Sequence, residues 1–270
     1  MRMTSVKAPA PSTGIQWWVL ACRLIRPSVR NGEVFTAVLA PAVFTLGFYV
    51  PLNMVMNTYG HGLSSYAQFL MPMIVMQSVS FCATSAAFRA AVDARDGLNA
   101  RFGTLPMPRA LPLAARITAA VYRAAVALAA ALACGLVIGV RFYGSAADTA
   151  GFVAFSMLVA VTLCLGADVL GTFSRSPEAT TQSLVLPQLI LGMVSTGFAP
   201  AEQFPAWMRG FARDQPVSQF VYALRALAGD PSGNAGTVGP AILVPALAWA
   251  LGLFAVFGAF AAVLAGRRIV

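Results

Sequence analysis

The sequence contains few of the residues on which catalytic and metal sites depend. Of its 270 residues only 10% are charged, compared with about 25% in a soluble domain, and only one is a histidine. Its four cysteines, Cys22, Cys82, Cys134 and Cys164, are far apart and form no CxxC pair, which is typical of small buried side chains. No phosphate-binding loop, HExxH zinc motif or GxSxG nucleophile motif occurs. We therefore expect a chain that is not an enzyme by itself and that holds neither a metal nor a cofactor.

The abundant residues are apolar. Hydrophobic residues make up 59% of the chain and the mean hydropathy is +0.75, which predicts an all-α integral membrane protein. A span through the hydrocarbon core needs about 20 apolar residues, and six segments approach or exceed that length, with the fifth the shortest. We predict transmembrane helices over residues 34–56, 67–88, 117–140, 150–173, 183–199 and 240–265.

Charge is distributed unevenly between the loops that join these spans. With the N-terminus placed inside, thirteen of the eighteen basic residues fall on the inner side, while basic and acidic residues balance on the outer side. Basic loops tend to remain on the cytoplasmic side of a membrane. We therefore predict a multi-pass protein of the plasma membrane with both termini in the cytoplasm. The net charge of +9 then reflects topology and contact with anionic lipid, so we expect no nucleic-acid partner.

Polar and amphipathic stretches accompany the spans. Residues 1–14 predict a disordered cytoplasmic tail, and residues 15–31 predict an interfacial elbow helix or, alternatively, the start of the first span. Paired tryptophans and nearby arginines favour the elbow helix: Trp17, Trp18, Arg23 and Arg26. Residues 32–270 would form a single six-helix membrane domain. Within it, residues 199–230 have apolar side chains at helical spacing, which predicts two short amphipathic helices that lie at or re-enter the outer membrane face.

A basic, proline-bearing segment of residues 90–112 interrupts the apolar pattern between the second and third spans. It includes RFGTLPMPR at 101–109 and is the largest element on the predicted cytoplasmic face. A short apolar contact flanked by charges would suit docking of another chain. A solvated, positively charged loop is the alternative.

Two charged residues fall inside predicted spans. Asp168 lies near the inner end of the fourth span and Arg123 near the inner start of the third, at similar depths of roughly 8 to 10 Å. Because an isolated charge in a membrane is costly, we predict that they form an ion pair. The alternatives are a proton relay through Asp168 and separate snorkelling of both side chains to the inner interface.

The order of these elements resembles the ABC type-2 export permeases. The resemblance rests on ARDGLNARFGTLPMPRALPLAARI at 94–117 and FPAWMRGFARDQPVSQFVYALRALAGD at 204–230. Together with NGEVFTAVLAPAVFTLGFYVP at 31–51, the second stretch is similar to the daunorubicin-resistance-type branch. That branch includes mycobacterial permeases implicated in the export of phthiocerol dimycocerosate lipids. The resemblance covers nearly the whole chain.

The resemblance implies a permease subunit that exports a hydrophobic drug or lipid. A separate ATPase subunit would bind ATP and Mg²⁺, and a second permease subunit, identical or different, would complete the pathway. The segment of residues 90–112 would be the coupling segment that contacts the ATPase, through Asp93, Arg95, Asp96, Arg101, Phe102, Leu105, Met107 and Arg109. Candidate residues of the substrate path are Phe44, Phe48, Tyr49, Gln77, Phe81, Met193 and Phe198.

Two other classes of function fit the same composition. A proton-driven secondary transporter would use Asp168 as its proton carrier, although such transporters usually show internal repeats. A membrane scaffold or assembly factor would transport nothing.

Overall fold

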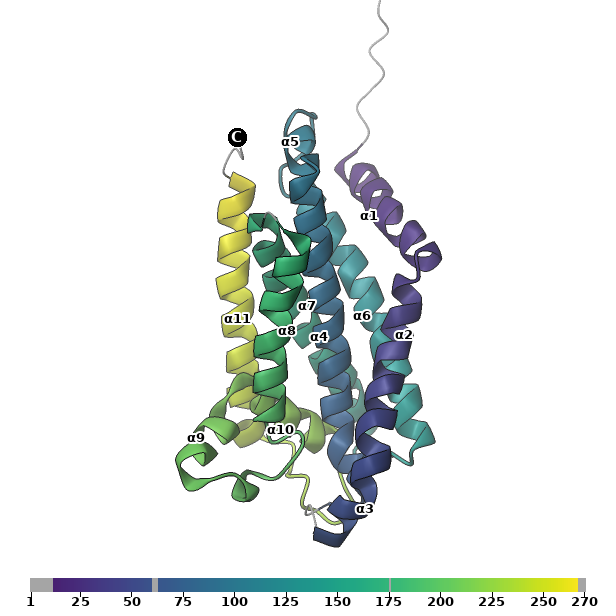
Figure 1. Cartoon of the computed structure of the whole chain (residues 1–270), viewed down its shortest axis with the longest axis vertical. Helices are drawn as coiled ribbons and strands as arrows, with labels where there is room; N and C mark the ends of the chain where they lie inside the picture. Colours follow the sequence, from purple (N-terminus) through teal and green to yellow (C-terminus); the bar gives the residue numbers. More distant parts are fainter. Residues whose placement is uncertain (1–11, 60–62, 175, 267–270) are drawn as a thin grey trace, which may run out of the picture.

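The computed structural model describes residues 12–59, 63–174 and 176–266, and every regular element within these ranges is a helix. The long helices run side by side along the longest axis of the molecule (Figure 1). Most of the predicted tail at residues 1–14 lies outside the described residues. Over these ranges, the prediction of an all-α protein is confirmed.

The first helix packs on the side of the bundle, against the later helix Leu111–Val137. Helix α1 covers Thr13–Arg30, close to the predicted 15–31, and it ends before Gly32, whose φ of 77° turns the chain into the next helix. The first predicted span is one rod of three pieces: α2 (Glu33–Phe44), the π-helix η1 (Thr45–Tyr49) and α3 (Val50–Tyr59). The π-helix follows Pro41, which has no N–H, and the hydroxyl of Thr45 donates to the Pro41 carbonyl at 2.7 Å.

Helix α4 is the centre of the bundle. It covers Tyr66–Arg95 and packs against α2, α6, α7, α8 and α10, so most of its side chains are buried. The C-terminal half of α4 is rich in alanines, so α7 can approach it closely at Gly171. A Cβ at Gly171 would overlap the carbonyl oxygen of Ala87. Small residues of this kind let two membrane helices approach closely. The helix continues seven residues past the predicted end at 88 and carries the start of the coupling segment on a rigid rod.

Five helical rods are long and apolar enough to cross a membrane by length and composition. They are residues 33–56, α4, α6 (Leu111–Val137), α7 (Ala146–Phe173) and α11 (Pro240–Gly266). The remaining predicted span, 183–199, was wrong in position, because α8 covers Pro177–Met193 and has only 17 residues. Its start is set by Pro177 in the first turn and by the Ser176 hydroxyl, which accepts from the Ala179 N–H.

The end of the bundle opposite α5 is closed by short elements. They are the 3₁₀ turn η2 (Ala201–Gln203), α9 (Ala206–Asp214) and α10 (Pro216–Ala228). Helix α9 leaves Trp207 exposed, whereas α10 is enclosed by α4, α7 and α11. This enclosure was not predictable from the sequence, and it buries Arg225. The guanidinium lies 3.7 Å from the ring centre of Phe69 and donates to the carbonyl oxygens of Phe69 and Gly197.

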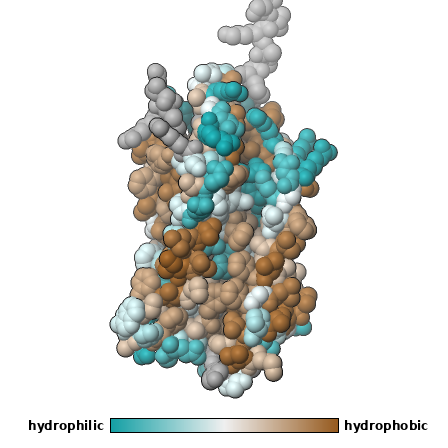
Figure 2. All heavy atoms as spheres, viewed as in Figure 1, coloured by the Kyte–Doolittle hydropathy of each residue, from teal (hydrophilic) through white to brown (hydrophobic). Residues whose placement is uncertain are grey.

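The surface is banded. Hydrophilic residues gather toward the two ends of the long axis, and hydrophobic residues gather between them (Figure 2). The start of α1, the end of α11 and α5 (Leu98–Gly103) all lie at the same end (Figure 1). The described ends of the chain therefore share one face with the coupling segment.

Candidate coupling site and transport path

The coupling segment is an ordered bridge between two long helices. Gly97, with a φ of 69°, ends α4 and starts the short helix α5. After α5, the Thr104 hydroxyl donates to the Arg101 carbonyl at 2.8 Å, and the Met107 N–H donates to the Leu105 carbonyl at 2.8 Å. Helix α6 then begins at Leu111. The segment is therefore joined at its two ends to α4 and α6.

Arg109 ties the coupling segment to the last helix. Its Nη1 donates to the carbonyl oxygen of Gly266 at 3.1 Å, at the C-terminal end of α11. A cation is favourable there because helix C-termini carry unpaired carbonyls and partial negative charge. This contact, which sequence reasoning missed, brings α11 into the same assembly as α4 and α6.

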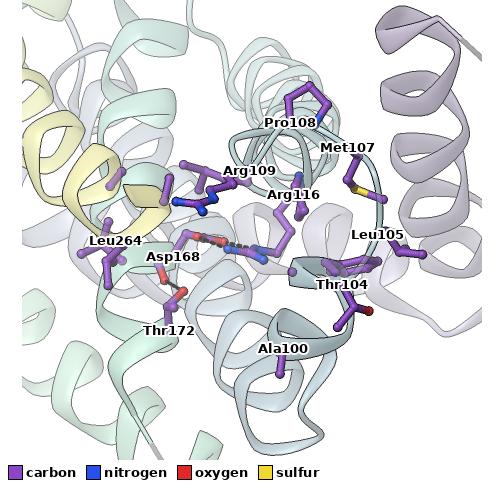
Figure 3. Close-up of a pocket in the computed structure, with 17 residues that line it drawn as sticks. Ala100, Thr104, Leu105, Met107, Pro108, Arg109, Arg116, Asp168, Thr172 and Leu264 are labelled. Carbon is purple, nitrogen blue, oxygen red and sulfur yellow. Dashed lines mark hydrogen bonds and ion pairs between the residues drawn. The ribbon is translucent and has the colours of Figure 1, made fainter. Parts of the chain in front are cut away.

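A cavity of about 600 Å³ lies between this segment and the helices. Its walls come from the coupling segment, α6, α7 and α11 (Figure 3). Four of the predicted coupling residues line it: Phe102, Leu105, Met107 and Arg109. The other four, Asp93, Arg95, Asp96 and Arg101, do not. Leu105 is also 49% exposed, while Phe102 and Met107 are only partly exposed.

The ion pair of Asp168 differs from the prediction. Arg116, not Arg123, binds it: Nε lies 2.7 Å from Oδ1 and Nη2 lies 2.9 Å from Oδ2. Figure 3 shows the two side chains pointing toward each other at the cavity wall. The prediction was wrong because it began the third span at residue 117, whereas α6 begins at Leu111 and includes Arg116 two turns before Arg123.

Arg123 pairs instead with Glu33, a residue that sequence reasoning missed. The Glu33 carboxylate accepts from Arg123 at 3.3 Å, from Ser28 at 2.7 Å and from Arg89. It therefore joins α1, α2, α4 and α6 at one point. One signal was available: Glu33 is the only acidic residue before Asp93, and it stands at the start of an apolar run.

A second cavity, of about 260 Å³, lies beside this carboxylate. Three carboxylates and three guanidiniums line it, those of Glu33, Asp93, Asp168, Arg89, Arg116 and Arg123. Arg116 and Asp168 line both cavities, so their ion pair lies between them. The charges balance, which is what a buried cluster in an apolar bundle requires.

Of the four predicted elbow residues, one contacts the bundle through a side-chain hydrogen bond and three are exposed. Trp17 donates through Nε1 to the Thr118 hydroxyl of α6 at 3.2 Å. Trp18, Arg23 and Arg26 are exposed. Helix α1 is therefore attached to the bundle by Trp17 and by the Ser28–Glu33 contact.

Several predicted path residues lie together on α2, η1, α4 and the turn after α8. The ring centres of Phe44 and Phe48 are 6.0 Å apart, those of Phe44 and Phe81 are 5.9 Å apart, and those of Phe48 and Phe198 are 4.6 Å apart. The four aromatic rings thus form one connected cluster that crosses from the first helical rod to α4.

The other three path candidates have separate surroundings. The Gln188 amide of α8 donates to the Gln77 amide oxygen of α4 at 3.0 Å, and the Thr84 hydroxyl lies 3.4 Å from the Gln188 oxygen. Tyr49 stacks on Tyr66 with ring centres 6.3 Å apart. Met193 is exposed on α8.

The structure is thus a bundle of long apolar helices with an ordered polar segment between α4 and α6, an arrangement that fits a membrane transport permease. No protein-family model matches the chain. The chain is 40% identical to the doxorubicin resistance ABC transporter permease protein DrrB in each of two strains of Mycobacterium tuberculosis, over 98% of this chain and 93% of that protein. It is 29% identical to the probable doxorubicin resistance ABC transporter permease protein DrrC of the same organism, over 74% of this chain and 72% of that protein.

The chain therefore belongs to the DrrB-like family of doxorubicin resistance ABC transporter permeases. This confirms the resemblance found in the sequence. The protein is a multi-pass membrane permease subunit that is not itself catalytic, and membership of the family implies a partner ATPase subunit. Among the residues that the structure describes, no group of three or more His, Cys, Asp or Glu side chains could hold a metal ion.

Proposed function

We propose that this permease exports a hydrophobic drug or lipid, with the coupling segment and both termini on the cytoplasmic side. The relatives are named for resistance to the drug doxorubicin, and a chain with so few polar residues in its helices suits hydrophobic or amphiphilic cargo. Helix α8 would be the sixth span, since its 17 residues extend about 25 Å at 1.5 Å per residue.

The ATPase subunit would dock on the coupling segment. The observation that supports this docking site is the ordered segment that joins α4 to α6. Arg109 also connects this segment to α11 through its hydrogen bond to Gly266. Leu105 is an exposed apolar side chain at its turn, and Pro106 and Pro108 restrict the backbone on either side of Met107. A restricted segment loses less entropy on docking, so it can transmit force from a partner without first having to order itself.

The cargo would pass along the aromatic cluster of Phe44, Phe48, Phe81 and Phe198. The amide pair of Gln77 on α4 and Gln188 on α8 would meet polar groups of an amphiphilic cargo. A second permease subunit would cover this face, because α2 and α8 expose many apolar side chains: Phe35, Val43, Leu46, Leu186, Leu189, Ile190 and Met193.

Site-specific photo-crosslinking tests the docking surface. A photoreactive phenylalanine analogue would replace Leu105 in one variant and Tyr143 in the other; these residues are 49% and 51% exposed and lie at opposite ends of α6. We expect a crosslink to the co-expressed ATPase subunit at residue 105 alone. A crosslink from residue 143, or none from residue 105 while the ATPase co-purifies, would disprove docking at the coupling segment.

A further inference from the structure

We infer that the cavity between the coupling segment and α11 is a binding site for one anionic membrane phospholipid. Its headgroup would meet Arg109, and an acyl chain would lie along α11. The inference goes beyond the proposed function, because lipid binding is a property of the permease alone and does not depend on an ATPase.

The charge of the lining favours an anion. Three ionisable residues line the cavity, Arg109, Arg116 and Asp168. Arg116 and Asp168 neutralise each other in a two-pronged ion pair. Arg109 makes no ion pair with any carboxylate in the described part of the chain, so the lining has one net positive charge. A cationic ligand is disfavoured, because the one carboxylate among these lining residues, that of Asp168, is already paired with Arg116.

The geometry at Arg109 fits a phosphate ester. One guanidinium nitrogen, Nη1, is directed to the Gly266 carbonyl. A guanidinium has five N–H donors in a planar fork that suits phosphate oxygens. Basic pockets between membrane helices on the cytoplasmic side are known to recognise lipid headgroups in this way.

The other wall of the cavity is apolar. It is made of Leu113 from α6, Val169 from α7, and Ala261, Leu264 and Ala265 from α11. The volume of about 600 Å³ is within the usual range of small-ligand sites, about 300 to 1,000 Å³. This combination of an arginine and a smooth apolar wall suits an amphiphile better than a free phosphate ion.

The apolar wall continues onto the outer surface of the bundle. Helix α11 is the least enclosed of the five apolar rods, with 11% of its most apolar stretch buried. Phe260 and Val263, next to the lining residues, are 55% and 51% exposed. An acyl chain that starts in the cavity can therefore leave along α11 into the surrounding lipid. A bound lipid would contact the coupling segment and α11 together.

Native mass spectrometry of the full-length permease would measure the binding. The protein would be titrated with phosphatidylglycerol, with phosphatidylcholine of the same chains, and with soluble glycerol phosphate. We expect phosphatidylglycerol to bind about tenfold tighter than phosphatidylcholine, because both lipids carry the phosphate but the net positive lining repels the choline cation of the second. Glycerol phosphate should not compete. Equal affinity for the two lipids would overturn the inference, and so would competition by glycerol phosphate, which would indicate a site for a free phosphate.

Two pairs of variants locate the site. Arg109→Gln should reduce phosphatidylglycerol binding about tenfold, while Arg101→Gln, on the same segment but outside the lining, should not. Ala265→Phe should obstruct the apolar wall of the cavity and weaken binding, while Ala262→Phe, on the exposed side of α11, should not. Equal losses within the first pair would indicate general surface charge, and retained binding in Ala265→Phe would place the lipid elsewhere; either result contradicts the inference.

Discussion

Replacing Asp168 with asparagine should destabilise the protein strongly. The side chain is 3% exposed and that of Arg116 is 12% exposed, and they make two short contacts of 2.7 and 2.9 Å. Removing one charge of a buried pair typically costs about 3 to 5 kcal/mol, because the other charge stays buried without compensation. Asparagine keeps the shape and one acceptor. We therefore expect a loss of about 3 kcal/mol in the free energy of unfolding, near the lower end of that range.

The assay is equilibrium unfolding of the purified permease in mixed micelles with increasing dodecyl sulfate, followed by tryptophan fluorescence. A matched control is Asp96→Asn, which breaks the contact with Arg95 in a pair whose two side chains are each 51% exposed. Exposed pairs contribute about 0 to 1 kcal/mol, so this variant should unfold much like the wild type. The double variant Asp168→Leu with Arg116→Met should recover most of the loss, because it leaves no unpaired charge.

Two results would refute this reasoning. If Asp168→Asn and Asp96→Asn were equally stable, the buried pair would not contribute as described. If Asp168→Asn unfolded normally but had lost transport, Asp168 would have a role in the transport cycle, as the proton-driven alternative requires. Measuring the folded yield and the transport rate on the same preparation separates these outcomes.

Three further substitutions test the packing around the site by the same unfolding assay. Glu33→Gln should lower the free energy of unfolding by about 2 to 3 kcal/mol, less than for a fully buried carboxylate, because the side chain is 25% exposed. An unchanged unfolding midpoint would contradict the role of Glu33 in joining four helices. Gly171→Ala should cost about 1 to 3 kcal/mol by forcing α7 away from the Ala87 carbonyl, while Gly252→Ala, which has open space, should be neutral or slightly stabilising. Arg225→Lys should cost about 2 kcal/mol, because lysine has neither the fork nor the planar face of arginine; full stability of that variant would show that the buried contacts are dispensable.

The spans were predictable wherever hydropathy alone decides the structure. Long apolar runs gave the rod from Glu33 to Met56 and helices α4, α6, α7 and α11 to within a few residues at most ends. Helix α8 was misplaced because its first turn is polar. A prediction from hydropathy leaves out Pro177 and Glu178, because neither residue is strongly apolar. The start of the helix is marked instead by the Ser176 cap, which is a local hydrogen bond.

The charge pairs were not predictable because they depend on helix starts and on tertiary packing. Asp168 and Arg123 were matched by depth, and an error of six residues at the start of α6 was enough to change the partner to Arg116. The Glu33 cluster needs four helices to meet at one point, and no spacing within one helix encodes that. The burial of Arg225 was not predictable either, since nothing in its own segment indicates the ring of Phe69, 156 residues earlier.

The position of the coupling segment follows from its charge and its prolines, but its shape does not. Sequence patterns identified Phe102, Leu105 and Met107 as an apolar contact. They could not reveal that these side chains also form the wall of a cavity, because that depends on where α11 ends and on the Arg109 contact with Gly266.

The affinity of the ATPase subunit for this permease in lipid nanodiscs tests the central proposal most directly. The double variant Phe102→Asp with Met107→Asp would be compared with the wild type and with Phe211→Asp, which changes a side chain 55% exposed on α9 at the other end of the bundle. Loss of central apolar contacts typically weakens an interface by about 2 kcal/mol or more. We predict that the double variant folds but binds the ATPase at least about tenfold more weakly, while Phe211→Asp binds normally. Normal ATPase binding by the folded double variant would contradict the proposal.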